Sequence, residues 1–175
     1  MASSSRAAIF RAWQPRISLV VRLAAGVIMV IAGWAKAVDL PGSVRAVRAY
    51  ELLPESFVPL VGNLLPFAEI VLGMLLIMGI FTRYVTAVYL AMILAFTFGV
   101  IWAWSTGLTI DCGCFGAGGE VAADQTNYPG HLLERTGFLA LGVWLFVFPR
   151  SVLSLDAWRE SARQRVEDAQ AAARA

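Results

Sequence analysis

The sequence predicts an all-α integral membrane protein: a bundle of four transmembrane helices with a short interfacial helix after the first span. Hydrophobic residues make up 59% of the 175 residues and charged residues only 15%, whereas soluble domains average about 45–50% and about 25%. The apolar residues are gathered in long runs, and the two cysteines lie in a polar segment before the last of them. These three observations carry the prediction.

The first apolar run is Ile17–Trp34, which only Arg22 interrupts. A helix rises about 1.5 Å per residue, so this run and its flanks match a hydrocarbon core about 30 Å thick. We therefore place the first span at about residues 17–36. A cleavable signal peptide is the alternative, because Ala35-Lys36-Ala37 resembles a small-x-small cleavage site. We favour the span, because the run is long for a signal peptide and a lysine lies inside the supposed site.

The segment Asp39–Glu55 separates the first two runs. Pro41-Gly42 and Pro54 interrupt it. Between them, apolar and charged residues occupy different faces of a helical repeat: Val44, Val47, Tyr50 and Leu53 against Arg45, Arg48 and Glu51. This pattern predicts a short amphipathic helix that lies at the membrane interface.

The second and third spans are expected close together in the chain. Leu60–Ile80 is apolar except for Pro66 and Glu69. Thr82-Arg83 is expected to form a tight turn, and Tyr84–Trp104, which has no charged residue, is expected to be the third span. Two tryptophans near the far end of this run are typical of the headgroup level.

The polar loop 105–131 carries the cysteines, and the fourth span is expected at 132–148. This last run is short, and it ends at Pro149-Arg150. Residues 1–16 and 149–175 are then two tails outside the four-helix domain. The second tail is rich in residues that favour helix, so it is expected to be a solvated helix.

The distribution of basic residues predicts which side each loop faces. One side of the membrane carries Arg6, Arg11, Arg16, Arg83, Arg150, Arg159, Arg163, Arg165 and Arg174; the other carries Arg45 and Arg48, with Lys36 at its border. The cysteine loop has no basic residue. The positive-inside tendency therefore places both termini in the cytoplasm of an inner or plasma membrane. The cysteine loop is then extracytoplasmic, where disulfides persist.

Cys112 and Cys114 are the candidate catalytic residues. Two cysteines one residue apart bridge only if the chain bends between them, which Gly113 permits. A strained, exposed disulfide is more oxidising than a structural one, and so small a ring stabilises a fold little. The pair therefore favours thiol–disulfide exchange over an inert or structural role, and over a Cu(I) site of two thiolates. Asp111 disfavours a thiolate at Cys112 by like charge, which indicates that Cys114 is the more reactive sulfur.

Ionisable residues within spans are functional hypotheses by default. Arg22 and Glu69 are expected to approach each other, either as a pair that fixes helix register or as a proton or quinone-headgroup site. Lys36 and Arg135 are expected near the level of the cysteine loop, where either favours a thiolate. His131 is expected to be an ordinary solvated residue. A single histidine and two cysteines argue against a tetrahedral zinc site within one chain.

Several short motifs together resemble one known family, the MauE (methylamine-utilisation) branch of the DoxX-like membrane proteins. The motifs are Arg22, Lys36-Ala37-Val38-Asp39, Tyr50-Glu51-Leu52-Leu53-Pro54, Leu65-Pro66-Phe67-Ala68-Glu69, Leu72-Gly73 and Cys112-Gly113-Cys114-Phe115-Gly116. They cover about residues 17–148. The resemblance implies a four-helix membrane bundle that takes part in disulfide formation in exported proteins.

The same resemblance implies partners and a candidate cofactor. MauE is linked to maturation of a disulfide-rich methylamine dehydrogenase subunit. Such proteins usually work with a thioredoxin-like partner. Relatives in the wider superfamily are linked to quinone reduction. We thus expect a lipid bilayer, a thioredoxin-like extracytoplasmic protein and a quinone as partners. Outside the chain ends, the sequence has no basic cluster interleaved with aromatic residues, so nucleic acid is not expected as a partner. The alternatives are a non-catalytic membrane assembly factor and a Cu(I)-handling protein.

Overall fold

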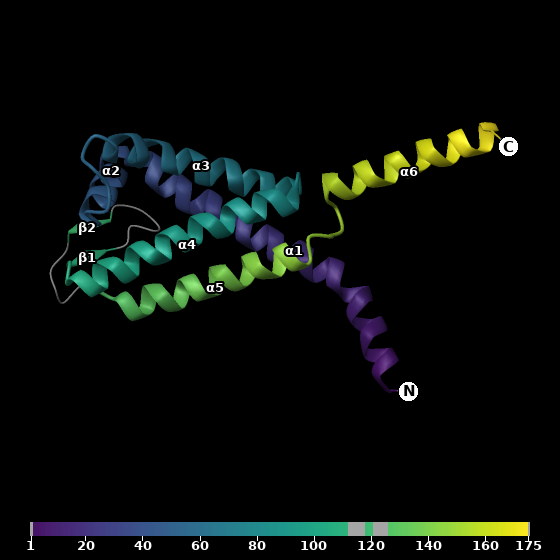
Figure 1. Ribbon diagram of the computed structural model, residues 1–175, viewed down its shortest axis with the longest axis horizontal. Coiled ribbons are helices and arrows are strands. Elements are labelled where there is room, and N and C mark those ends of the chain that lie inside the picture. Colours follow the sequence, from purple (N-terminus) through teal and green to yellow (C-terminus); the bar gives the residue numbers. More distant parts are fainter. Residues whose placement is uncertain (1, 112–117, 121–125, 175) are drawn as a thin grey trace.

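The computed structural model describes residues 2–111, 118–120 and 126–174. Cys112 and Cys114 lie outside these described residues. The described chain is helical except for one pair of two-residue strands (Figure 1). Its elements are α1 (Ala2–Val38), α2 (Leu40–Ala49), α3 (Val58–Met78), α4 (Thr82–Thr106), β1 (Ile110–Asp111), β2 (Gly119–Glu120), α5 (Tyr128–Val147) and α6 (Leu155–Arg174).

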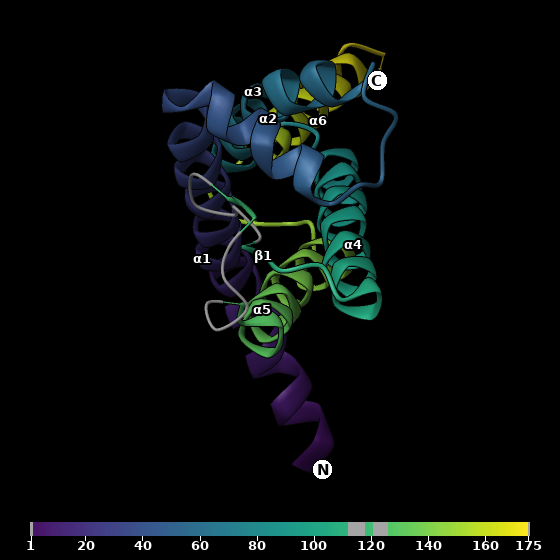
Figure 2. The same ribbon diagram turned by 90° about the vertical axis from the view of Figure 1, so that its left-hand side faces the viewer.

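The helices α1, α3, α4 and α5 run side by side along the long axis of the molecule (Figures 1 and 2). Most of the packing lies between α1 and α3 and between α4 and α5. The short helix α2 lies at one end of this bundle, where it packs on α3 and meets β2. Both termini lie at the opposite end, and α6 projects from there. The ends of the bundle are therefore different: one carries the hairpin, the other the termini.

Among the described residues, three helical segments are long and apolar enough to cross a membrane: Ala12–Val38, Val58–Met78 and Thr82–Thr106. Large apolar side chains cover the outside of the bundle, among them Val20, Ile31, Leu64, Phe67, Val88, Leu94 and Phe98. An apolar exterior is what a bilayer requires, so the prediction of a helical membrane protein is confirmed. The helix expected as the fourth span is present as α5, which does not meet the same criterion of length and composition.

The two spans α1 and α3 cross through glycines. A Cβ atom added at Gly73 would lie 2.7 Å from the carbonyl oxygen of Gly26. One added at Gly33 would lie 2.6 Å from the carbonyl oxygen of Pro66. Small residues let helix backbones approach closely in membranes, where packing replaces the hydrophobic driving force. This close crossing fixes how far α1 is shifted along α3, and so which residues of the two helices meet.

The turn between α3 and α4 differs from the expected one. Thr82-Arg83 lies in the first turn of α4, not in a turn between helices. The chain reverses just before it, at Gly79 and Phe81, which both have positive φ angles (66° and 46°). Asp156, at the start of α6, accepts hydrogen bonds from the backbone N–H of Phe81 (2.9 Å) and of Thr82 (2.8 Å). A distant carboxylate thus satisfies the free donors at the start of α4.

The predicted short helix after the first span is confirmed as α2. Its buried face is formed by small residues: Gly42, Ser43, Ala46 and Ala49. The Ser43 hydroxyl donates to the carbonyl oxygen of Gly62 on α3 (2.8 Å), and Val44 packs against the same glycine. Small side chains allow this close contact, so α2 is held tightly across the end of the bundle.

Candidate functional site

A buried ion pair joins α1 to α3 beneath α2. The Lys36 Nζ atom donates to both carboxylate oxygens of Glu69, at 2.6 and 2.8 Å. Lys36 is 8% exposed and Glu69 is 2% exposed. Side chains of a helix point back toward its N-terminus, so the long Lys36 side chain reaches from the end of α1 toward the interior. The lysine therefore does not extend outward to the interface; it neutralises a buried carboxylate.

The expected approach of Arg22 to Glu69 is wrong. Arg22 lies about 21 Å along α1 from Lys36, at about 1.5 Å per residue, near the other end of the bundle. Its Nη2 atom donates to the carbonyl oxygen of Leu153 (2.9 Å), and its Nη1 atom lies beside Gly79. Nε and Nη1 have no hydrogen-bond partner among the described residues. The glycine crossing sets this register, and it brings Lys36 rather than Arg22 level with Glu69.

A second cation lies close to the ion pair. Arg135 on α5 is 3% exposed. Its guanidinium carbon lies 5.7 Å from the centre of the Phe96 ring, and Lys36 Nζ lies 5.6 Å from the same ring centre. Cations over an aromatic face are attracted by its quadrupole. Of the four charged residues expected at the site, the structure thus brings together Lys36, Glu69 and Arg135, with both cations close to the Phe96 ring.

These charges line a cavity of about 420 Å³ among α1, α2, α3, α4 and α5. Apart from the three charges, its wall is almost entirely apolar and aromatic, and includes Met29, Tyr50, Leu52, Met92, Phe96 and Phe138. A concave apolar wall with a few convergent polar groups is typical of a small-molecule site. The cavity has the size and character for a flat, lipophilic molecule whose polar end faces the charges.

The segments that lead into and out of the cysteine loop lie beside the same end of the bundle. Ile110 pairs with Glu120 and Asp111 with Gly119 in an antiparallel register. Ile110 is 2% exposed and packs in a cluster with Ala49, Val100, Ala103 and Tyr128. Because Ala49 belongs to α2 and α2 lines the cavity, the hairpin and the cavity share one wall.

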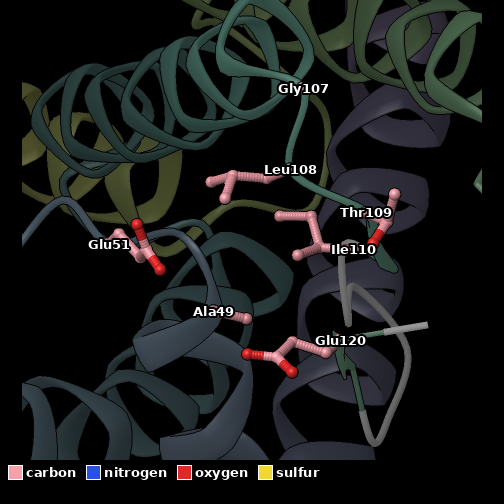
Figure 3. A pocket seen from close by; sticks show the side chains of 7 residues that line it. All are labelled: Ala49, Glu51, Gly107, Leu108, Thr109, Ile110 and Glu120. Atoms are coloured by element: carbon pink, nitrogen blue, oxygen red, sulfur yellow. The ribbon is translucent and has the colours of Figure 1, made fainter.

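A second hollow of about 410 Å³ lies where the hairpin meets the end of α2 (Figure 3). Its lining includes two carboxylates, Glu51 and Glu120, and the apolar side chains of Leu108 and Ile110. Glu51 has a φ of 51°, an uncommon angle for a residue with a side chain. Within the described part of the chain, no group of three or more His, Cys, Asp or Glu side chains is placed to hold a metal ion.

His131 is not the ordinary solvated residue that the sequence led us to expect. Its Nε2 atom lies 3.5 Å from Oδ1 of Asp111, and its side chain is 21% exposed. Asp111 directly precedes Cys112 in the chain. His131 also lies four residues before Arg135, on the same face of α5. Sequence reasoning missed this contact because it depends on how a loop closes between Asp111 and α5.

Comparison with known proteins identifies one family. A family model described as "Methylamine utilisation protein MauE" matches residues 14–148, well over half of the chain. No curated protein and no solved structure matches the chain. The match spans α2 to α5 and most of α1, and so includes every residue of the candidate site.

Proposed function

The chain belongs to the MauE family, and from this membership we propose that it is a membrane thiol–disulfide redox protein that supports disulfide formation in exported proteins. The family links it to methylamine utilisation. The single observation that carries the redox proposal is that α2 contributes residues both to the charged cavity and to the cluster that holds Ile110, two residues before Cys112 in the chain. This arrangement supports a passage of electrons between a water-facing thiol pair and a lipophilic acceptor.

The proposal includes a topology. Both termini lie in the cytoplasm, α5 is the fourth span, and the hairpin with the cysteine loop is extracytoplasmic. The distribution of arginines supports this orientation. The packing of α5 along α4 supports α5 as the fourth span. Labelling of Cys112 and Cys114 from the cytoplasm alone, by a membrane-impermeant maleimide, would overturn it.

The chemistry begins with a partner dithiol of the thioredoxin-like class. One partner thiolate attacks the Cys112–Cys114 disulfide, which forms a mixed disulfide and releases one cysteine as a thiolate. The second partner thiolate resolves the mixed disulfide. The partner then holds a disulfide, and Cys112 and Cys114 are both reduced. Two electrons and two protons have been transferred to this protein. The hollow beside the hairpin is where we place the contact with the partner.

Reoxidation of the pair requires an acceptor, and the cavity fits a quinone. Lys36 and Arg135 carry N–H donors suited to a carbonyl oxygen, and the apolar wall suits a ring with an isoprenoid chain. A bound quinone supplies an acceptor for two electrons and two protons, which balances oxidation of a dithiol to a disulfide. The role of the chain's own residues is to orient the ring against Phe96, to keep water out, and to hold a proton at the Glu69 carboxylate.

Serine variants of the two cysteines test the redox proposal. We expect Cys112→Ser and Cys114→Ser each to abolish disulfide formation in an exported substrate, while the variant proteins reach the membrane in normal amounts. Full disulfide formation with both serines present would contradict the proposal. It would favour the alternative of a non-catalytic protein that positions a maturation partner. Copper that copurifies with the wild type but not with the double variant would instead favour a Cu(I)-handling protein.

A further inference from the structure

The exposed part of the cavity wall lies on one side of the cavity. Within the part of the chain that the structure describes, the wall residues with exposed side chains are Leu52, Leu53, Ala95 and Phe98. The wall residues that α1, α2, α3 and α5 contribute are buried or half-buried. We call the four exposed residues the mouth of the cavity. The mouth is formed by α4 and by the segment 50–57 that joins α2 to α3.

The end of the cavity toward α2 is covered. Ser43 and Ala46 of α2 belong to its wall, and the connecting segment reaches across to α4. A Cβ atom added at Gly99 would lie 3.3 Å from Cδ1 of Tyr50 and 3.7 Å from Cδ1 of Leu52. The helices α3 and α4, by contrast, diverge from their shared turn toward this end (Figure 1), and the main packing partner of α3 is α1. The mouth therefore opens sideways, between α3 and α4.

This opening faces the hydrocarbon of the membrane. Ala95 lies near the middle of α4, and α4 is long and apolar enough to cross a bilayer. All four residues of the mouth are apolar. Phe98 at the mouth is 60% exposed, whereas Glu69 in the interior is 2% exposed. The cavity is therefore charged at its inner end and apolar where it meets the lipid.

We propose that the cavity takes its ligand sideways from the bilayer, with a polar ring held inside and a single apolar chain that leaves between α3 and α4. The inference rests on the proposed function for the identity of this ligand, a long-chain quinone. The cavity of about 420 Å³ is near the lower end of the range for small-molecule sites, about 300–1,000 Å³. It holds a ring, but a long isoprenoid chain must continue into the lipid. A phospholipid, with two chains and a large charged headgroup, fits this cavity poorly.

Photoaffinity labelling tests where the chain leaves. The full-length Cys112→Ser/Cys114→Ser protein in lipid nanodiscs is used, so that no thiol reacts with the quinone. Two probes share one ring and one chain of isoprene units; the photoreactive group is on the ring in the first and on the second isoprene unit in the other. We expect the ring probe to label Phe96, and the chain probe to label Leu53 or Phe98. Labelling of α1 or α5 by the chain probe would overturn the proposal.

A pair of tryptophan variants tests the mouth by affinity in the same protein. Ala95→Trp places a large side chain at the mouth. Ala91→Trp is the matched control, because Ala91 is also exposed on α4, one turn earlier, and is not part of the cavity wall. We expect Ala95→Trp to weaken binding of the long-chain quinone about tenfold, because the chain loses its apolar contacts, and binding of the same ring with a methyl group in place of the chain by less than about threefold. Ala91→Trp is expected to change neither affinity.

Equal losses for the two quinones with Ala95→Trp, or equal effects of the two variants, would overturn the proposal. The outcomes also separate this inference from the function on which it rests. If the ring binds inside and the chain leaves elsewhere, the inference alone fails. If neither quinone binds, the quinone step of the proposed function fails with it.

Discussion

Lys36 and Glu69 hold each other through two hydrogen bonds in a cavity whose remaining wall is mostly apolar. Removing two charges from water is costly, and their attraction compensates only with good geometry. Here the lysine reaches both carboxylate oxygens. The pair is therefore a poor source of net stability, yet either charge alone in this place would be far worse.

The first prediction concerns this pair. We expect Glu69→Gln to destabilise the protein by about 3 kcal/mol, because it leaves the Lys36 ammonium buried without a counter-charge. The double variant Lys36→Met/Glu69→Leu is expected to regain most of that loss. Denaturant unfolding in detergent micelles measures both. If the double variant loses as much stability as the Lys36 and Glu69 single variants added together, the two charges do not stabilise each other in the folded protein.

A second pair, outside the spans, predicts a pH dependence. Arg48 donates to Glu55 from Nε (3.0 Å) and Nη2, and this hydrogen bonding lowers the pKa of the Glu55 carboxyl. A carboxyl with a lowered pKa stabilises the folded state above its unfolded-state pKa, about 4.3 for Glu. That contribution is lost as the pH falls through the folded-state pKa.

We therefore expect Glu55→Gln to melt at a slightly lower temperature than the wild type at pH 7, and the two melting curves to converge below about pH 4. The pair is fully exposed, so the difference at pH 7 is small. Glu51→Gln, in the same connecting segment, is the control and is expected to show no such convergence. A constant difference between Glu55→Gln and wild type across this range would contradict the assignment.

For single residues, the sequence correctly identified most of the charged side chains of the cavity, but it did not predict which of them pair. Glu69, Lys36 and Arg135 were identified because ionisable residues in apolar runs are rare and costly. The predicted partner of Glu69, Arg22, was wrong, because the partner depends on the register between α1 and α3. His131 was missed because a loop brings it to Asp111. Cys112 and Cys114 lie outside the described residues, so their role stays a prediction.

The crossing of α1 and α3 is the element-scale feature on which the site depends. Gly26 and Gly73 meet in a backbone contact too close for a Cβ atom, and Gly33 meets Pro66 in the same way. If the helices were pushed apart here, Lys36 would no longer lie level with Glu69. The glycines therefore determine the geometry of the site, and Gly33 lies directly against the Cβ atom of Glu69.

We accordingly expect Gly73→Ala to destabilise the protein by about 1–3 kcal/mol, since the new methyl group overlaps the backbone of Gly26. Gly137→Ala on α5 is the matched control: nothing lies within 4 Å of its Cβ position, so the helix-favouring alanine should be neutral or slightly stabilising. Thermal unfolding of both variants in the same micelles makes the comparison. Equal effects would show that the crossing is not tightly packed.

The helices themselves were predictable because long apolar runs leave few alternatives. The helices α3 and α4 lie close to the expected ranges, whereas α1 contains the expected first span but begins at Ala2, in the segment expected as a separate tail. Their ends were less so. Thr82-Arg83 was read as a turn, but Asp156, more than 70 residues later, provides hydrogen bonds that let α4 begin there. The buried face of α2 was also unexpected: the pattern predicted Val44 and Val47, but the buried residues are small, and of the two valines Val44 contacts Gly62.

At the scale of the whole molecule, the hairpin lies at the same end of the bundle as α2 (Figure 1), and α2 contributes residues to the wall of the charged cavity. From the sequence, the short helix was expected to lie at the membrane interface. Packed across the bundle, α2 instead forms a wall common to both. The central claim is that the cysteine pair and the cavity form one redox unit.

The most direct test of this claim is a count of thiols. Purified, fully reduced protein is mixed with a water-soluble, short-chain quinone, and its free thiols and the quinol are measured together. The account predicts that two thiols disappear for each quinol formed, and that Glu69→Gln slows this reaction without changing its stoichiometry. Thiols that persist in the presence of excess quinone, or quinol formed equally by the Cys112→Ser/Cys114→Ser protein, would contradict it.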